Sequence, residues 1–97
     1  MSQKNLIPLH KLCDLYKVEM SFFSSLNDIG LIQIITLEQI QWIPQEKITD
    51  VEKMIRMHHE LNINIEGIDI AFNLLQRIDD LENELNALKN KLHFYEN

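Results

Sequence analysis

The side chains best suited to chemistry in this sequence are four histidines and one cysteine, and their spacing does not build a metal site. His58 and His59 are adjacent, so on a helix they point about a third of a turn apart and are poorly placed to share one metal ion. His10 and Cys13 have a spacing that suits two ligands, but no second pair completes a tetrahedral site. We therefore expect no metal and no cofactor, and we assign the adjacent histidines to packing and solvent exposure.

Carboxylates are abundant, but they are not placed for catalysis. Asp79, Asp80, Glu82 and Glu84 fall on the predicted solvent side of a helix, where no water-excluding cleft is expected. The sequence offers no nucleophile with a base and an orienting partner, and it has no glycine-rich phosphate loop. We expect a chain that is not an enzyme.

Composition points to one soluble domain with a modest core. The chain has 97 residues, of which 45% are hydrophobic and 25% charged. Its net charge of −6 and pI near 5.0 oppose binding to nucleic acid or to an anionic membrane surface. A single cysteine excludes a disulfide framework, and we find neither a signal-peptide pattern nor an apolar run of about 18 residues. These features predict a cytoplasmic protein.

The element that must position everything else is a long helix predicted over residues 64–95. Asn64 is a suitable N-cap, and no proline interrupts the run. Its first half carries a wide apolar stripe, which is typical of a helix that packs into its own domain. That stripe consists of Ile65, Ile68, Ile70, Ala71, Phe72, Leu74 and Leu75. Further on, the stripe narrows to a seam with steps of three and four residues, which needs another helix to cover it. The seam consists of Ile78, Leu81, Leu85, Leu88, Leu92 and Tyr95.

The residues before this helix predict a pair of short helices. Pro8 suits the first turn of a helix whose inward side is Leu9, Leu12 and Leu15. A second helix over residues 19–27 turns Phe22, Phe23 and Leu26 inward. Two short helices joined by a tight turn are a candidate helix-turn-helix.

A wing and a third helix complete the predicted head. Gly30 suits a helix C-cap, and the β-branched residues of 31–43 predict a two-stranded wing. A third helix is predicted over residues 45–61, with Asn62 as its stop. The expected fold is mainly α, with a winged helix-turn-helix head over residues 1–63 and a long helix over residues 64–97, forming one domain overall.

The predicted helix-turn-helix lacks the charge that DNA binding requires. A DNA-reading helix presents side chains that contact bases and phosphates. The exposed positions of the second helix are instead Glu19, Ser21, Ser24, Ser25, Asn27 and Asp28. The wing has no basic residue before Lys47, and its polar positions are Gln33, Thr36, Glu38, Gln39 and Gln41. A DNA-binding shape without cations favours protein recognition.

The whole arrangement resembles a MerR-type winged head, and its second half is similar to the CbpM-type chaperone modulators. That likeness rests on the run Met57-His58-His59-Glu60-Leu61-Asn62-Ile63-Asn64-Ile65-Glu66-Gly67-Ile68, then Ala71-Phe72-Asn73-Leu74-Leu75 and the heptads. The resemblance implies a bacterial cytoplasmic protein that binds the J-domain of a CbpA-type co-chaperone and inhibits its work with a DnaK-type chaperone. The alternative is a MerR-type DNA-binding transcriptional regulator, although the basic wing motif usual in such regulators is absent.

Two surfaces of the long helix are the candidate sites. J-domains present a basic helix, as the resemblance implies, and an acidic helical face would compete for it. The partner-binding residues we expect are Asp69, Gln76, Asp79, Asp80 and Asn83. If these residues do not form the interface, we expect it on the second helix and the wing, around Phe23, Gln33 and Trp42. For self-association we expect Ile78, Leu81, Leu85, Leu88 and Leu92. Parallel and antiparallel pairing both bring opposite charges together, so the sequence leaves the orientation open.

Overall fold

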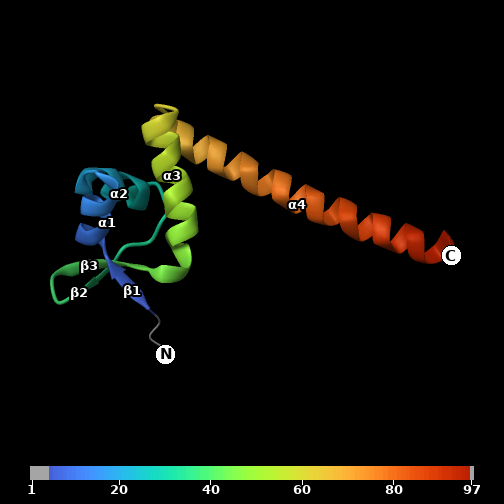
Figure 1. Cartoon of the computed structure of the whole chain (residues 1–97), viewed down its shortest axis with the longest axis horizontal. Coiled ribbons are helices and arrows are strands. Elements are labelled where there is room, and N and C mark those ends of the chain that lie inside the picture. Colours follow the sequence, from blue (N-terminus) through green and yellow to red (C-terminus); the bar gives the residue numbers. More distant parts are fainter. Residues whose placement is uncertain (1–4, 97) are drawn as a thin grey trace.

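A small head and one protruding helix make up the structure, a computed structural model that describes residues 5–96 (Figure 1). The elements in chain order are β1 (Leu6–Pro8), α1 (Leu9–Tyr16), α2 (Met20–Asp28), β2 (Ile35–Leu37), β3 (Ile40–Pro44), a 3-10 turn (Gln45–Lys47), α3 (Ile48–Glu60) and α4 (Ile65–Glu96). The fold is mainly α with a winged helix-turn-helix head, as the sequence predicts. The predicted head (residues 1–63) and the predicted long helix (residues 64–97) also include residues 1–4 and 97, which lie outside the described range.

The helix-turn-helix forms where the sequence predicts it. α1 ends at Lys17, whose φ of 60° is left-handed, and α2 starts three residues later. α2 ends before Gly30, which has a φ of 88° that glycine adopts without steric cost. The prediction that Leu15 faces inward is wrong, because its side chain is 69% exposed. Leu15 lies in the last turn of α1, beyond the part of that helix that the core covers.

The sheet has three strands where the sequence predicts a two-stranded wing. Its order is β1-β3-β2, with both pairs antiparallel. The wing turn is Glu38-Gln39, and both residues have positive φ, which gives the tight connection that a two-residue hairpin needs. The additional strand is β1, where Pro8 pairs with Trp42 instead of entering the first turn of α1. Residues 31–34 form no strand.

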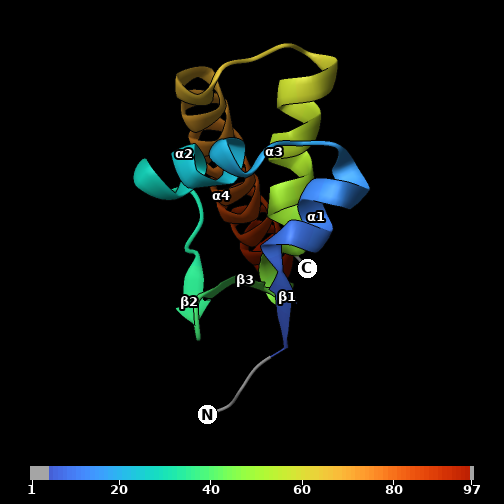
Figure 2. The ribbon, with the colours of Figure 1, turned by 90° about the vertical axis from the view of Figure 1, so that its left-hand side faces the viewer.

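The core lies where α1, α2, α3 and β3 meet. Its fully buried side chains are Leu9, Phe23, Leu26, Ile43, Val51, Met54 and Ile68. The sheet and the α3–α4 connection lie at opposite ends of the head, as the two ribbon views agree (Figures 1 and 2). That connection turns at Asn62, whose φ is 57°, so the predicted helix stop is confirmed. Within residues 5–96, no helix is both long enough and apolar enough to span a bilayer.

α4 begins as predicted but leaves the head sooner than its apolar stripe suggests. Asn64 Oδ1 accepts a hydrogen bond from the backbone N of Gly67 at 2.8 Å, which caps the helix. A Cβ on Gly67 would lie 2.6 Å from Ile63 Cγ2, so only glycine lets the first turn approach the connection this closely. Ile68 is fully buried, yet Ile70, Leu74 and Leu75 are between 49% and 62% exposed.

The prediction that the whole stripe from residue 65 to 75 packs into the head is therefore wrong. Packing ends near Phe72, because α4 diverges from α3 beyond that point (Figure 1). At 1.5 Å per residue the 32 residues of α4 extend about 48 Å. The radius of gyration is 17.5 Å, where a compact chain of this length has about 12.5 Å. Most of α4 thus has no packing partner among residues 5–96.

Candidate protein-interaction surfaces

Four of the five predicted partner-binding residues form one exposed patch on α4. Gln76, Asp79, Asp80 and Asn83 follow the i, i+3, i+4, i+7 spacing, so they share one side of the helix, and all are exposed. Asp69 lies about two turns earlier and is half-buried. Its carboxylate accepts a hydrogen bond from Asn73 Nδ2 at 2.9 Å. Asp69 is thus partly engaged within the helix, whereas the other four side chains face solvent. We call Gln76, Asp79, Asp80 and Asn83 the acidic face.

The acidic face borders a groove between α3 and α4. A cavity of about 460 Å³ is lined by Asp50, Lys53, Phe72, Leu75, Gln76, Ile78, Asp79 and Glu82. A second cavity of about 310 Å³ is lined by Lys53, Arg56, Met57, Glu60, Leu61 and Leu75. Lys53 and Leu75 belong to both cavities, so the two are one continuous surface feature, which we call the α3–α4 groove. Its floor is apolar, and its rim is acidic at one end and basic at the other.

The helix-turn-helix surface has the low charge that the sequence predicts. Glu19, Ser21, Asn27 and Asp28 are exposed along α2, and the two remaining serines of that face are half-buried. From Val18 to Glu46 the chain contains no lysine and no arginine. The wing instead exposes apolar side chains next to its turn, with Leu37 at 50% and Ile40 at 45%. A partly apolar wing without lysine or arginine suits contact with protein better than contact with phosphates.

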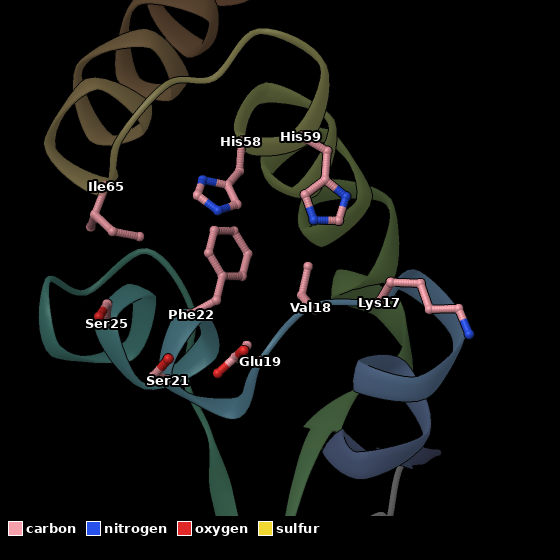
Figure 3. A pocket seen from close by; sticks show the side chains of 9 residues that line it. All are labelled: Lys17, Val18, Glu19, Ser21, Phe22, Ser25, His58, His59 and Ile65. Atoms are coloured by element: carbon pink, nitrogen blue, oxygen red, sulfur yellow. The ribbon is translucent and has the colours of Figure 1, made fainter.

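An open pocket lies beside α2, and its floor is a ring stack that sequence reasoning did not predict (Figure 3). His58 stacks on Phe22 with ring centroids 4.8 Å apart and an interplanar angle of 29°. His58 Nδ1 lies 3.2 Å from the carbonyl oxygen of Ile63, so this nitrogen carries the proton and donates. The pocket measures about 400 Å³ and is lined by Lys17, Val18, Glu19, Ser21, Phe22, Ser25, His58, His59 and Ile65. The sequence predicts Phe22 on the inward side of its helix and assigns His58 to packing and solvent exposure, but the contact between them depends on how α2 and α3 cross.

His58 is a structural residue of the α3–α4 corner. The backbone N of Ile63 donates a hydrogen bond to the carbonyl oxygen of Met57 at 3.1 Å. The imidazole of His58 donates to the carbonyl oxygen of the same Ile63. His59 is exposed, with its ring 5.6 Å from that of His58. Across residues 5–96, no three His, Cys, Asp or Glu side chains gather as metal ligands would. His58 therefore ties the end of α3 to the connection from which α4 leaves the head.

The remaining reactive side chains are held in unreactive states. Burial, and secondarily the charge of Asp14, raises the pKa of the Cys13 thiol, which keeps it protonated and poorly nucleophilic at neutral pH. The Tyr16 hydroxyl donates to the Glu52 carboxylate, and this hydrogen bond is the main reason that the pKa of Tyr16 is raised. That bond joins α1 to α3, so the tyrosine has a structural role.

The seam on α4 is exposed along its whole length. Ile78, Leu81, Leu85, Leu88, Leu92 and Tyr95 have between 50% and 76% of their surface accessible. The chain as a whole exposes 7285 Å², against roughly 5,800 Å² for a compact chain of its mass. A contiguous apolar stripe of this kind marks an interaction surface.

Comparison with known proteins supports one family. Residues 7–90 match the sequence profile of a family described as MerR HTH family regulatory protein, and the match covers most of the chain. No curated protein and no solved structure matches significantly.

Proposed function

Because this chain belongs to the MerR HTH family of regulatory proteins, we propose that it uses a DNA-binding fold for protein recognition. In this proposal it is a non-enzymatic modulator that binds the J-domain of a CbpA-type co-chaperone and inhibits its work with a DnaK-type chaperone. Such partners belong to the bacterial cytoplasm, where the chain would act. The observation that carries the proposal is the distribution of charge: α2 and the wing lack lysine and arginine, and the acidic face lies on a helix that projects from the head.

The acidic face suits a basic helix as its ligand. Asp79 and Asp80 are exposed, and neither has an ion-pair partner among residues 5–96. Glu82 and Glu84 follow within the next turn, so the negative charge extends along the helix. A partner with a row of lysine or arginine side chains would gain electrostatic attraction during approach and charge-assisted hydrogen bonds on contact.

Reversing this charge should weaken J-domain binding without disturbing the fold. We expect Asp79→Lys with Asp80→Lys to lower the affinity by about 1 to 3 kcal/mol, to slow association and to flatten the dependence on salt. The matched control is Asp14→Lys with Glu46→Lys, which changes the net charge equally at exposed sites in the head. Calorimetric titration with a CbpA-type J-domain, after circular dichroism has shown equal helix content, measures the difference. Equal losses in both variants would place the interface elsewhere.

The family match favours a second candidate function, transcriptional regulation through DNA. Specific regulators bind their sites at about 10⁻⁸ M or tighter, largely through cations that neutralise phosphates. Along the chain, the nearest lysines to the stretch that holds α2 and the wing are Lys17 before it and Lys47 after it. We therefore expect no sequence-selective binding to duplex DNA in an anisotropy titration at physiological salt. Salt-sensitive, selective binding in the nanomolar range would make the regulator the correct description.

We also propose that the seam joins two copies of the chain when no other partner covers it. Six apolar side chains on a narrow stripe match what a two-stranded coiled coil buries. The charged residues that flank the stripe would set the partner and the orientation.

A further inference from the structure

We infer that the outer face of the three-stranded sheet is a docking site for an amphipathic helix of a second protein, one with an apolar stripe and basic flanks. This site is separate from the acidic face of α4, and the inference goes beyond the proposed binding of a J-domain. α4 leaves the head from the end opposite the sheet, so one chain can hold both partners at once (Figures 1 and 2).

The sheet has an apolar side chain at every position of its outer face. Side chains alternate between the two faces of a strand, and Ile43 of β3 is fully buried in the core. Its neighbour Trp42 therefore lies on the opposite face, and the antiparallel register sets residues of β1 and β2 beside it on that face. What we call the outer sheet face consists of Leu6, Pro8, Ile35, Leu37, Ile40, Trp42 and Pro44.

The core covers only the other face of this sheet. None of the side chains of the outer sheet face belongs to the core, and none is among the half-buried apolar side chains that pack against the core. Leu37 and Ile40 are 50% and 45% exposed, and the others are half-buried. A sheet that is apolar on both faces is normally covered by a layer on each side. Residues 5–96 provide such a layer on one side, so a partner is needed for the second.

Trp42 is the centre of the outer sheet face. It lies on the middle strand, paired with Pro8 of β1 on one side and Ile35 of β2 on the other. Its Nε1 is shielded from solvent and has no hydrogen-bond partner among residues 5–96. A buried indole N–H normally has an acceptor, and a partner toward which the indole turns can supply one. Tryptophan at the centre of an apolar patch is also the residue type that most often anchors a protein interface.

The dimensions of the outer sheet face suit one helix. Neighbouring strands lie about 4.8 Å apart, so three strands are about 10 Å wide, which is the diameter of an α-helix. β3 has 5 residues and is about 17 Å long, which corresponds to roughly 11 residues, or three turns, of helix. A single helix lying along the strands therefore covers the whole face, and a helix on a sheet is a common pair of layers in folded domains.

The charge near the outer sheet face selects a basic helix. Glu38 in the wing turn is exposed, and the chain has no lysine or arginine from Val18 to Glu46 that would offset it. At the other end of β3, Lys47 follows Glu46, so these two charges offset each other. The chain as a whole carries a net charge of −6. A helix with lysine or arginine beside its apolar stripe is therefore attracted during approach and meets Glu38 on contact.

The single tryptophan of the chain makes occupancy of this face directly measurable. The probe is a peptide of leucine and lysine of about 18 residues, long enough to form a helix and patterned with leucine on one side. It contains no tryptophan, so all indole emission comes from Trp42. We expect saturable binding in which this emission moves to shorter wavelength, because the peptide covers the indole. The same peptide with glutamate in place of lysine should bind at least about tenfold more weakly.

Substitutions in the wing distinguish this face from the other apolar surfaces of the chain. Leu37→Thr with Ile40→Thr removes two exposed apolar side chains and keeps residues that favour a strand. This variant should bind the leucine–lysine peptide about tenfold more weakly or worse. The matched control is Leu85→Gln with Leu88→Gln, which removes two exposed apolar side chains from α4 and should leave the affinity unchanged. An equal loss in both variants would overturn the assignment to the outer sheet face.

The choice of a basic partner has its own pair of variants. Glu38→Lys should weaken binding of the leucine–lysine peptide about three- to tenfold, because it replaces attraction at the wing turn with repulsion. Glu60→Lys makes the same change at an exposed position at the far end of α3 and should leave the affinity within about twofold. Equal losses would mean that the net charge of the chain, and not the wing, attracts the peptide.

The same emission identifies any other occupant. Peptide binding without a change in Trp42 emission would overturn the inference, since the peptide would then lie elsewhere. A shift on raising the concentration of the chain alone would make a second copy the occupant, and a shift with phosphatidylcholine vesicles would make it a lipid surface. A J-domain that binds and produces the same shift would assign this face to the proposed partner. A J-domain that binds without the shift supports two separate sites, and failure of the J-domain to bind leaves the peptide result standing.

Discussion

Replacing Leu85 and Leu88 by glutamate is expected to leave this chain folded and monomeric at concentrations where the parent is a dimer. Both leucines are more than half exposed in the single chain, so the head does not depend on them. In the paired state they form the central layers of the seam, where each buried leucine contributes about 2 kcal/mol that a glutamate forfeits. The dissociation constant should therefore rise by more than about 100-fold.

The control for this variant is Asn86→Glu with Asn90→Glu, which adds the same charge to the same half of α4 outside the seam. Sedimentation equilibrium of both variants separates the loss of apolar contact from the added repulsion. If the control dissociates as far as the leucine variant, net charge and not the seam governs association.

Truncation of Ile68 is expected to have the largest effect on stability. Ile68 is the one side chain of α4 that is fully buried, and it packs in the hydrophobic core of the head. Ile68→Ala should lower the free energy of unfolding by about 2 to 5 kcal/mol, a large part of the 5 to 15 kcal/mol typical of a small domain.

Ile70→Ala is the matched control, because it makes the same change two residues further along the same helix at a side chain that is 62% exposed. Its effect should stay within about 0.5 kcal/mol. Urea unfolding followed by circular dichroism, at a protein concentration too low for self-association, measures both. Similar losses in the two variants would mean that α4 is not anchored to the core through Ile68.

Local signals in the sequence predicted most of the fold. Asn64 as a cap, Asn62 as a stop and Gly30 after α2 each have a backbone role that depends only on neighbouring residues, and all three hold in the structure. β1 was missed because three residues ending in Pro8 show no alternation, and their pairing with β3 joins segments more than 30 residues apart. Such long-range pairing leaves little trace in a local pattern.

The number of α4 residues that pack on the head was overestimated for a different reason. Ile68 and Leu75 are seven residues apart and share a face of the helix, yet Ile68 is fully buried and Leu75 is 49% exposed. Spacing shows that apolar residues share a face, but the angle at which α4 leaves the head decides how many of them the head covers. The acidic face was predicted from charge alone, and its contact with a partner stays a prediction. The Phe22–His58 stack could not be predicted from the sequence, because it depends on how α2 and α3 cross.

The most direct test of protein recognition by this fold is a titration of the intact chain with a CbpA-type J-domain at physiological salt. We predict saturable binding that weakens as salt increases, because an acidic helix meets a basic one. The same preparation should show no sequence-selective affinity for duplex DNA. Absence of J-domain binding up to about 100 μM, a level at which even weak specific complexes would be populated, would contradict the account.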